Sequence, residues 1–142
     1  MAIIESNYKA PLLFKNKHLA TVLPSMYRKV EVNYDRERLE LNDGDFVDVD
    51  WLGKGREKII VLSHGLEGDS HRHYITAIAK YFYEKGWGVA AWNCRSCSGE
   101  MNRLPRLYSH IDMLDLAEVV DHVSTTECKE IALAGISMGG VI

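Results

Sequence analysis

The chain has 142 residues, of which 46% are hydrophobic and 26% charged, and its formal net charge at pH 7 is −3. This length and composition are typical of one soluble globular domain with a modest core. Charges of both signs are interspersed, without a basic stripe that could follow a phosphate backbone, so nucleic acid is not an expected partner. No apolar run approaches the roughly 18 residues of a transmembrane span, and the N-terminus lacks a signal-peptide pattern, which predicts a cytoplasmic protein.

The first 27 residues contain Pro11 and Pro24 and apolar residues without a clear period. This stretch predicts an extended arm, residues 1–27, lying on a body formed by residues 28–142. The body opens with two β-like segments, residues 30–41 and 46–52. Asn-Asp-Gly between them favours a tight turn, so we predict an antiparallel hairpin.

In the second hairpin segment, valines and a tryptophan alternate with Asp48 and Asp50. Because successive side chains of a strand point to opposite faces, the carboxylates share the face opposite the apolar set. A metal site on these residues together with Asp43 and Asp45 is an alternative, but the spacing does not match an EF-hand loop. We expect a solvated strand face and no metal.

From residue 58 onward the pattern becomes an alternation of strands and helices. Short apolar runs at residues 59–62, 89–92 and 130–135 predict strands that are covered on both faces. Amphipathic segments at residues 69–85 and from Ser109 onward predict helices between them, the second opened by a capping box of Ser109 and Asp112. This order predicts an α/β fold with a parallel sheet and helices on both faces.

Ligands of such sheets bind beyond the carboxyl ends of the strands. Three predicted loops leave those ends, at residues 64–68, 93–99 and 137–140. We expect them to converge on one site.

The strongest signal is the run 135–139, Gly-Ile-Ser-Met-Gly, directly after an apolar strand. In a G-x-S-x-G turn the serine adopts a strained backbone that lifts its hydroxyl clear of the sheet. Gly135 and Gly139 are expected where strand and helix pass too closely for a Cβ atom. We predict that Ser137 is a nucleophile, although serine needs a neighbouring imidazole to remove its proton. A glycine-rich turn with an incidental serine is the alternative.

Two backbone amides are candidates for an oxyanion hole, the pair of donors that stabilises the negative oxygen of a tetrahedral intermediate. The N–H of Met138 follows the serine, and the loop His-Gly-Leu-Glu-Gly at residues 64–68 can contribute the N–H of Leu66. We expect His64 and Gly65 to position that loop, with His64 acting through side-chain hydrogen bonds and not as the base.

The long loop between the second and third predicted strands of the parallel set contains cysteines and arginines. Cys94 and Cys97 have C-x-x-C spacing, but zinc normally needs a second ligand pair and a redox motif opens a helix, so a structural role is expected. With Cys128 the cysteines are odd in number, which predicts reduced thiols. The three arginines of the loop could hold an anionic substrate group, but we expect hydrogen bonds that join the loop to the body, from Arg95, Arg103 and Arg106.

Several segments of the sequence resemble the YheT-like branch of the α/β-hydrolase superfamily. They are HGLEGDSHRHYI, NCRSCSGE, PRLY and GISMGG, together with KNKHLATVLPSMYR and GDFVDVDW near the start. The resemblance implies the α/β-hydrolase fold, a mostly parallel sheet with an N-terminal antiparallel hairpin. It also implies a serine hydrolase that acts on carboxylic esters, small-molecule or lipid, through an acyl-enzyme and without a cofactor, using a triad in the order Ser, Asp, His.

Only the serine of that triad has a counterpart here, at Ser137. The resemblance therefore implies that residues 28–142 are the N-terminal half of the domain, truncated after the nucleophile elbow, with an exposed sheet edge that permits self-association. No motif positions another base among the remaining histidines, which are His18, His71, His73, His110 and His122. The alternative function is a catalytically inactive half-domain that acts only as an interaction or vestigial product.

Overall fold

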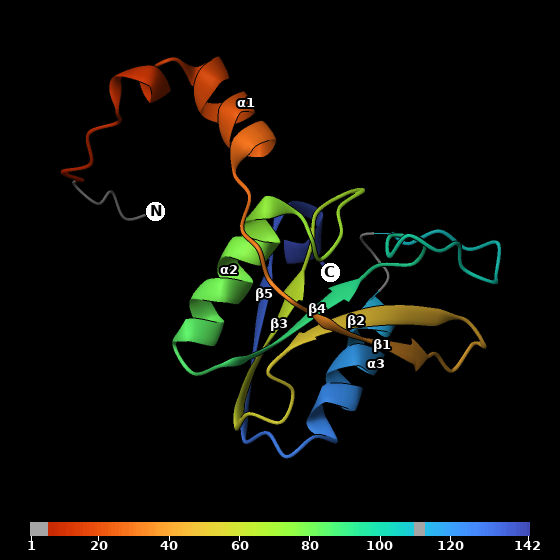
Figure 1. Ribbon diagram of the computed structural model, residues 1–142. Helices are drawn as coiled ribbons and strands as arrows, with labels where there is room; N and C mark the ends of the chain where they lie inside the picture. Colours follow the sequence, from red (N-terminus) through yellow and green to blue (C-terminus); the bar gives the residue numbers. More distant parts are fainter. Residues whose placement is uncertain (1–5, 110–112) are drawn as a thin grey trace.

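The computed structural model describes residues 6–109 and 113–142. Its five strands form a single sheet in the order β1-β2-β4-β3-β5. The elements are, in chain order, the 3-10 helix η1 (Leu12–Lys15), α1 (Lys17–Tyr27), β1 (Asp35–Glu40), β2 (Phe46–Leu52), β3 (Lys58–Ser63), α2 (His73–Glu84), β4 (Gly88–Asn93), α3 (Met113–Ser124), β5 (Glu130–Gly135) and the 3-10 helix η2 (Ser137–Gly140). Figure 1 shows α2 and α3 on opposite sides of the sheet and α1 apart from both.

The predicted hairpin and parallel strands are both present. Strands β1 and β2 pair antiparallel, from Asp35 opposite Trp51 to Glu40 opposite Phe46, so the first strand begins five residues later than predicted. Strand β3 pairs in parallel with β4 on one side and β5 on the other. The hairpin joins this set through an antiparallel pairing of β2 with β4. The sheet is therefore mixed, as expected for an α/β fold that carries an antiparallel hairpin.

Alternating side chains of the central strands supply both faces of the core. On the side of α3, Val61 and Ala90 pack with Val119 and Val123 of that helix. On the side of α2, Leu62 packs with Ile75 and Ala79, which are almost completely buried. Strands covered on both faces have continuous apolar runs, which is why residues 59–62 and 89–92 lack a polar alternation.

Helix α2 begins at His73, four residues later than predicted. The Asp69 carboxylate accepts the N–H of His71 at 2.8 Å, which closes a local turn before the helix instead of capping it. Gly86, with a φ of +89°, follows the end of the helix. The capping box predicted for α3 includes Asp112, which lies outside the described residues.

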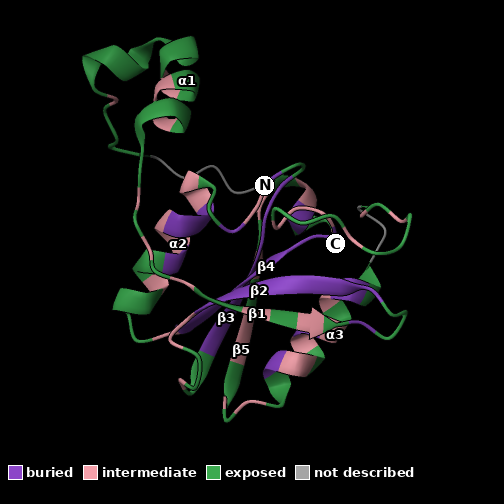
Figure 2. Cartoon of the chain, turned by 45° about the vertical axis from the view of Figure 1, so that its right-hand side comes forward, coloured by how far each residue is buried: buried purple, intermediate pink, exposed green. Residues whose placement is uncertain are grey.

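The prediction of an extended arm lying on the body is wrong. Residues 17–27 form helix α1, whose first N–H groups are capped by the Asn16 side chain through His18 and Leu19. Its apolar residues recur at helical spacing, and this outweighs the loss of one backbone donor at Pro24. The helix stands away from the sheet and is largely exposed (Figures 1 and 2). In residues 6–109 and 113–142, no helix has the length and apolar character needed to cross a bilayer.

The prediction that Asp48 and Asp50 face solvent is also wrong, since each is only 1% exposed. Two arginines of β1 cover this face. Arg36 binds both carboxylate oxygens of Asp50 at 2.7 and 2.8 Å, and Arg38 does the same for Asp48 at 2.9 and 3.0 Å. Such bidentate pairs compensate much of the cost of taking a carboxylate out of water.

Candidate active site

The loops that follow β3, β4 and β5 meet at one end of the sheet, as predicted. The backbone N–H of Cys94 donates to Nε2 of His64 at 3.0 Å, which joins the loops after β4 and β3. Gly139, after β5, lies so close to the first of these loops that an added Cβ would come within 2.5 Å of the His64 carbonyl oxygen. The three carboxyl ends therefore form one contiguous region.

Ser137 lies at the turn from β5 into η2 and is exposed. Its φ of +56° falls in the left-handed region, which residues other than glycine rarely adopt. A Cβ added at Gly135 would collide with the carbonyl of Gly139. The strained serine and the two close glycines agree with the geometry expected of a G-x-S-x-G elbow.

His64 is buried and has no ring nitrogen left for catalysis. Its Nε2 accepts the Cys94 N–H, and its Nδ1 lies 2.7 Å from the carbonyl oxygen of Gly65, which it reaches as a donor in the Nδ1–H tautomer. Burial lowers the pKa of His64, so the neutral ring is favoured. This arrangement agrees with a loop-positioning role and not with that of a base.

Two tyrosines hold the loop 64–68 from outside it. The hydroxyl of Tyr74 accepts the N–H of Gly65 at 3.2 Å, and that of Tyr108 accepts the N–H of Glu67 at 2.7 Å. Glu67 has a φ of +51°, so its backbone needs external support. Sequence reasoning missed both tyrosines; the only signal was that Tyr74 lies in the HGLEGDSHRHYI segment and Tyr108 in the PRLY segment.

A hollow of about 430 Å³ brings the candidate residues together, and it is lined by Leu66, Ser137, Met138 and Val141. Within the part of the chain that the structure describes, the N–H groups of Leu66 and Met138 have no hydrogen-bond acceptor. Both amides are thus available to a ligand oxygen. Leu66 also lines a neighbouring cleft of about 450 Å³, whose apolar wall includes Met101 and Leu107.

A general base for Ser137 is not found among the described residues, since no histidine lines its hollow. His122 bonds Glu37 at 3.1 Å, His71 packs edge-on against Tyr34, and His73 packs against its neighbour Tyr74. His110 lies outside the described residues.

The arginines of the long loop join it to the body, as predicted. Arg95 is 1% exposed and binds both oxygens of Asp115 at 2.7 and 2.8 Å and Asp45 at 2.9 Å. Arg103 binds Glu40, and Arg106 pairs with Asp43 at 3.1 Å. None of the three lines the hollow of Ser137.

The cysteines are free thiols, as expected. Burial raises the pKa of Cys94 to about 12 and also raises the pKa of Cys97, so both stay protonated near neutral pH.

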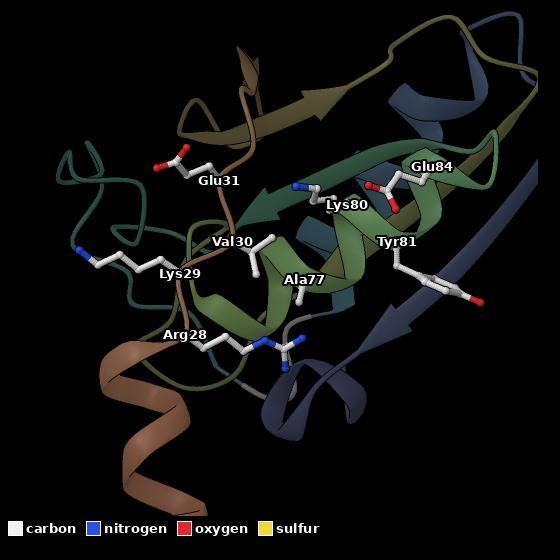
Figure 3. Close-up of a pocket in the computed structure, with 8 residues that line it drawn as sticks. All are labelled: Arg28, Lys29, Val30, Glu31, Ala77, Lys80, Tyr81 and Glu84. Atoms are coloured by element: carbon white, nitrogen blue, oxygen red, sulfur yellow. The ribbon is translucent and has the colours of Figure 1, made fainter.

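A separate hollow, of about 530 Å³, lies between residues 28–31 and α2 and is shown in Figure 3. Its lining carries both signs of charge, with Arg28 and Lys80 against Glu31 and Glu84. It shares no residue with the hollow of Ser137 and contains no serine, cysteine or histidine. It is therefore not part of the candidate active site.

No family model matches the chain. Over 101 residues the chain is 38% identical to YheT of Escherichia coli K12, which is provisionally named an esterase; the match covers 67% of this chain and 29% of YheT. It is 27% identical to the human phospholipase ABHD3, a match that covers 99% of this chain and 37% of ABHD3. The chain thus spans about a third of the length of these relatives.

Among solved structures, the fold is similar to that of the Pyrococcus furiosus esterase Pf2001, with a TM-score of 0.63 and 22% identity over 77% of this chain and 44% of that one. At this identity the likeness shows the fold alone. The sequence similarity to YheT and ABHD3 agrees with this fold, with the mixed sheet and with the serine turn after β5. Together they show that the chain belongs to the α/β-hydrolase superfamily and contains part of that domain.

Proposed function

We propose that this chain supplies the nucleophile and the oxyanion hole of a serine hydrolase that acts on carboxylic esters. The observation that carries the proposal is the hollow in which the exposed Ser137 meets the unpaired amides of Leu66 and Met138. Relatives named esterase and phospholipase support an ester substrate, either a small molecule or a lipid.

In the proposed reaction, Oγ of Ser137 attacks the ester carbonyl carbon and its proton passes to a base. The carbonyl oxygen becomes an oxyanion that accepts hydrogen bonds from the N–H groups of Leu66 and Met138. The intermediate collapses as the C–O bond to the alcohol breaks and the alcohol takes the proton, leaving an acyl-enzyme. Water then releases the carboxylic acid and restores the serine.

We further propose that the base and its orienting carboxylate come from a part of the domain that these 142 residues do not contain. The chain spans about a third of its relatives, and in the superfamily triad Asp and His follow the serine in sequence. An oxyanion hole without a base retains only a small residual rate. We therefore expect this chain alone to show negligible ester turnover.

The second candidate is a catalytically inactive half-domain that acts through interactions. It is favoured by the absence of any histidine in the hollow of Ser137 among the described residues. The two candidates differ in whether Ser137 can be activated.

Labelling with a fluorophosphonate probe distinguishes them, with adducts located by mass spectrometry. For the proposed function we expect slow labelling at Ser137 that added imidazole accelerates, because imidazole replaces the missing base. Ser137→Ala should abolish the adduct, whereas Ser124→Ala, which removes an exposed serine of α3, should not. Equal labelling of other serines, or none at Ser137 even with imidazole, would favour the inactive half-domain.

A further inference from the structure

The N-terminal arm, taken in this section to include the connection to β1 and thus to span the described residues 6–30, differs in charge from the rest of the chain. It contains five of the seventeen Lys and Arg residues and none of the twenty Asp and Glu residues. Its cations are Lys9, Lys15, Lys17, Arg28 and Lys29. All five are exposed, and among the described residues none forms an ion pair. In contrast, the arginines of β1 and of the long loop are paired with carboxylates.

The same arm presents an apolar helix face to solvent. Leu19, Val22 and Met26 recur at helical spacing on α1 and are 37%, 48% and 63% exposed. The 3-10 helix η1 adds Leu12 at 83%, and Tyr27 ends α1 at 72%. Figure 2 shows most of α1 as exposed, well separated from the buried sheet.

The two helices of the arm, η1 and α1, contact each other. Leu13 and Phe14 of η1 line a hollow together with Leu23 and Pro24 of α1. The helix thus uses one side to pack on η1 and leaves the other side, with Val22 and Met26, uncovered.

We propose that the arm binds the surface of a membrane rich in anionic lipid. An amphipathic helix with an uncovered apolar face and flanking cations lies in the interface, its apolar side chains among the acyl chains and its Lys and Arg residues at the headgroups. Lys15 and Lys17 lie at the start of α1 and Arg28 and Lys29 directly follow its end, so cations lie at both ends of the apolar face. In Figure 3 the Lys29 side chain points away from α2, free to reach a headgroup.

The charge of the arm favours lipid over a second copy of the chain as the occupant. Pairing two arms face to face would bring ten cations together without a carboxylate to neutralise them, whereas an anionic bilayer supplies the opposite charge over its whole surface. Binding of this kind does not require Ser137, so the proposal is independent of the proposed function.

The test is co-sedimentation of the purified chain with vesicles of phosphatidylcholine alone or with phosphatidylserine added. We expect at least tenfold stronger binding to the anionic vesicles, which high salt weakens. Because each cation near the surface contributes about a fivefold factor, a Lys15→Gln, Lys17→Gln, Lys29→Gln variant should bind about 100-fold more weakly. Ser137→Ala should bind as the unmodified chain does.

A matched pair of variants tests the apolar face. Val22→Gln with Met26→Gln should weaken binding at least tenfold, while Met113→Gln with Leu114→Gln, on the similarly exposed start of α3, should not. All three tryptophans lie in the body, so their fluorescence verifies its folding in every variant. The proposal would be overturned if the chain bound anionic vesicles no more strongly than neutral ones. It would also be overturned if the α1 pair and the α3 pair of substitutions weakened binding equally, or if the chain were a dimer that the arm variants convert to a monomer.

Discussion

The backbone of Ser137 is held in a conformation that costs about 1–3 kcal/mol in isolation. Its neighbours hold it in place. The N–H of Ile136 donates to the carbonyl of Ser63 at 3.1 Å, and Gly139 packs against the carbonyls of Ser63 and His64. Residues at the end of β3 and directly after β3 and β5 thus fix the serine turn, and the absence of a side chain at Gly139 permits this approach.

Gly139→Ala should therefore destabilise the fold, because its Cβ would lie 2.5–2.6 Å from two backbone oxygens that cannot move aside freely. We expect a loss of about 1–3 kcal/mol in the free energy of unfolding, measured by urea denaturation with tryptophan fluorescence. Gly140→Ala is the control, since its nearest contact would be at 3.2 Å and its loss should be smaller. Equal losses of stability in the two variants would show that the close packing at Gly139 does not contribute to the stability of the fold.

The buried His64 predicts a pH dependence of stability. Burial lowers its pKa in the folded chain below the unfolded value of 6.5. As the pH falls below about 6.5, the unfolded chain takes up a proton that the folded chain does not, so the free energy of unfolding decreases by up to about 1.4 kcal/mol per pH unit. Above that pH this contribution is fully present. Denaturation at pH 7.5, 6.5 and 5.5 measures it.

The test variant is His64→Gln. It should lose part of the slope between pH 7.5 and 5.5, because glutamine does not titrate. An unaltered slope in His64→Gln would contradict the assignment.

At the scale of elements, buried charge connects the hairpin, the long loop and α3. Arg95 lies at the start of the loop and pairs with Asp45 beside β2 and with Asp115 of α3. Burial by itself would raise the pKa of Asp45, but hydrogen bonds from the Asn102 amide and the Arg103 N–H hold it at about 2. These polar contacts keep one wall of the cleft beside Ser137 in position.

Arg95→Met should cost about 3–5 kcal/mol of stability, because it leaves buried carboxylates without their cation. The control is Arg103→Met. Arg103 and its partner Glu40 are 47% and 60% exposed, and an exposed pair of this kind contributes about 1 kcal/mol or less. Thermal and urea denaturation measure both, and similar losses in the two variants would refute the distinction.

At the scale of the whole molecule, the sheet is unequally covered. Strand β2 is almost entirely buried, whereas β5 pairs with β3 alone among the described strands, and its Leu133 is 59% exposed. An apolar strand with an unpaired edge is a template for pairing with another chain.

We therefore expect the isolated chain to self-associate as its concentration rises. Leu133→Lys should reduce the association, because a charge on an edge strand opposes strand addition. Tyr81→Lys, a change of similar exposure on α2, should not. Light scattering over a concentration series measures the difference, and an unmodified chain that stays monomeric throughout would contradict the prediction.

The sequence alone was sufficient to predict the alternation of strands and helices, the hairpin and the serine turn. These features are encoded locally: buried strands are continuous apolar runs, Asn-Asp-Gly favours a tight turn, and two glycines flank Ser137. A loop-positioning role for His64 stays a prediction, and the sequence did not indicate which atoms its ring would contact.

Only the tertiary structure decided which polar groups are buried and which hydrogen-bond or ion-pair partners they have. Asp50 alternates with apolar residues as a solvated strand face does, yet it is covered by Arg36 from the paired strand. The hydroxyl of Tyr108 reaches the N–H of Glu67, 41 residues away in sequence. Whether a carboxylate or an amide leaves water depends on a partner that compensates its lost hydration, and folding brings that partner from a distant part of the chain.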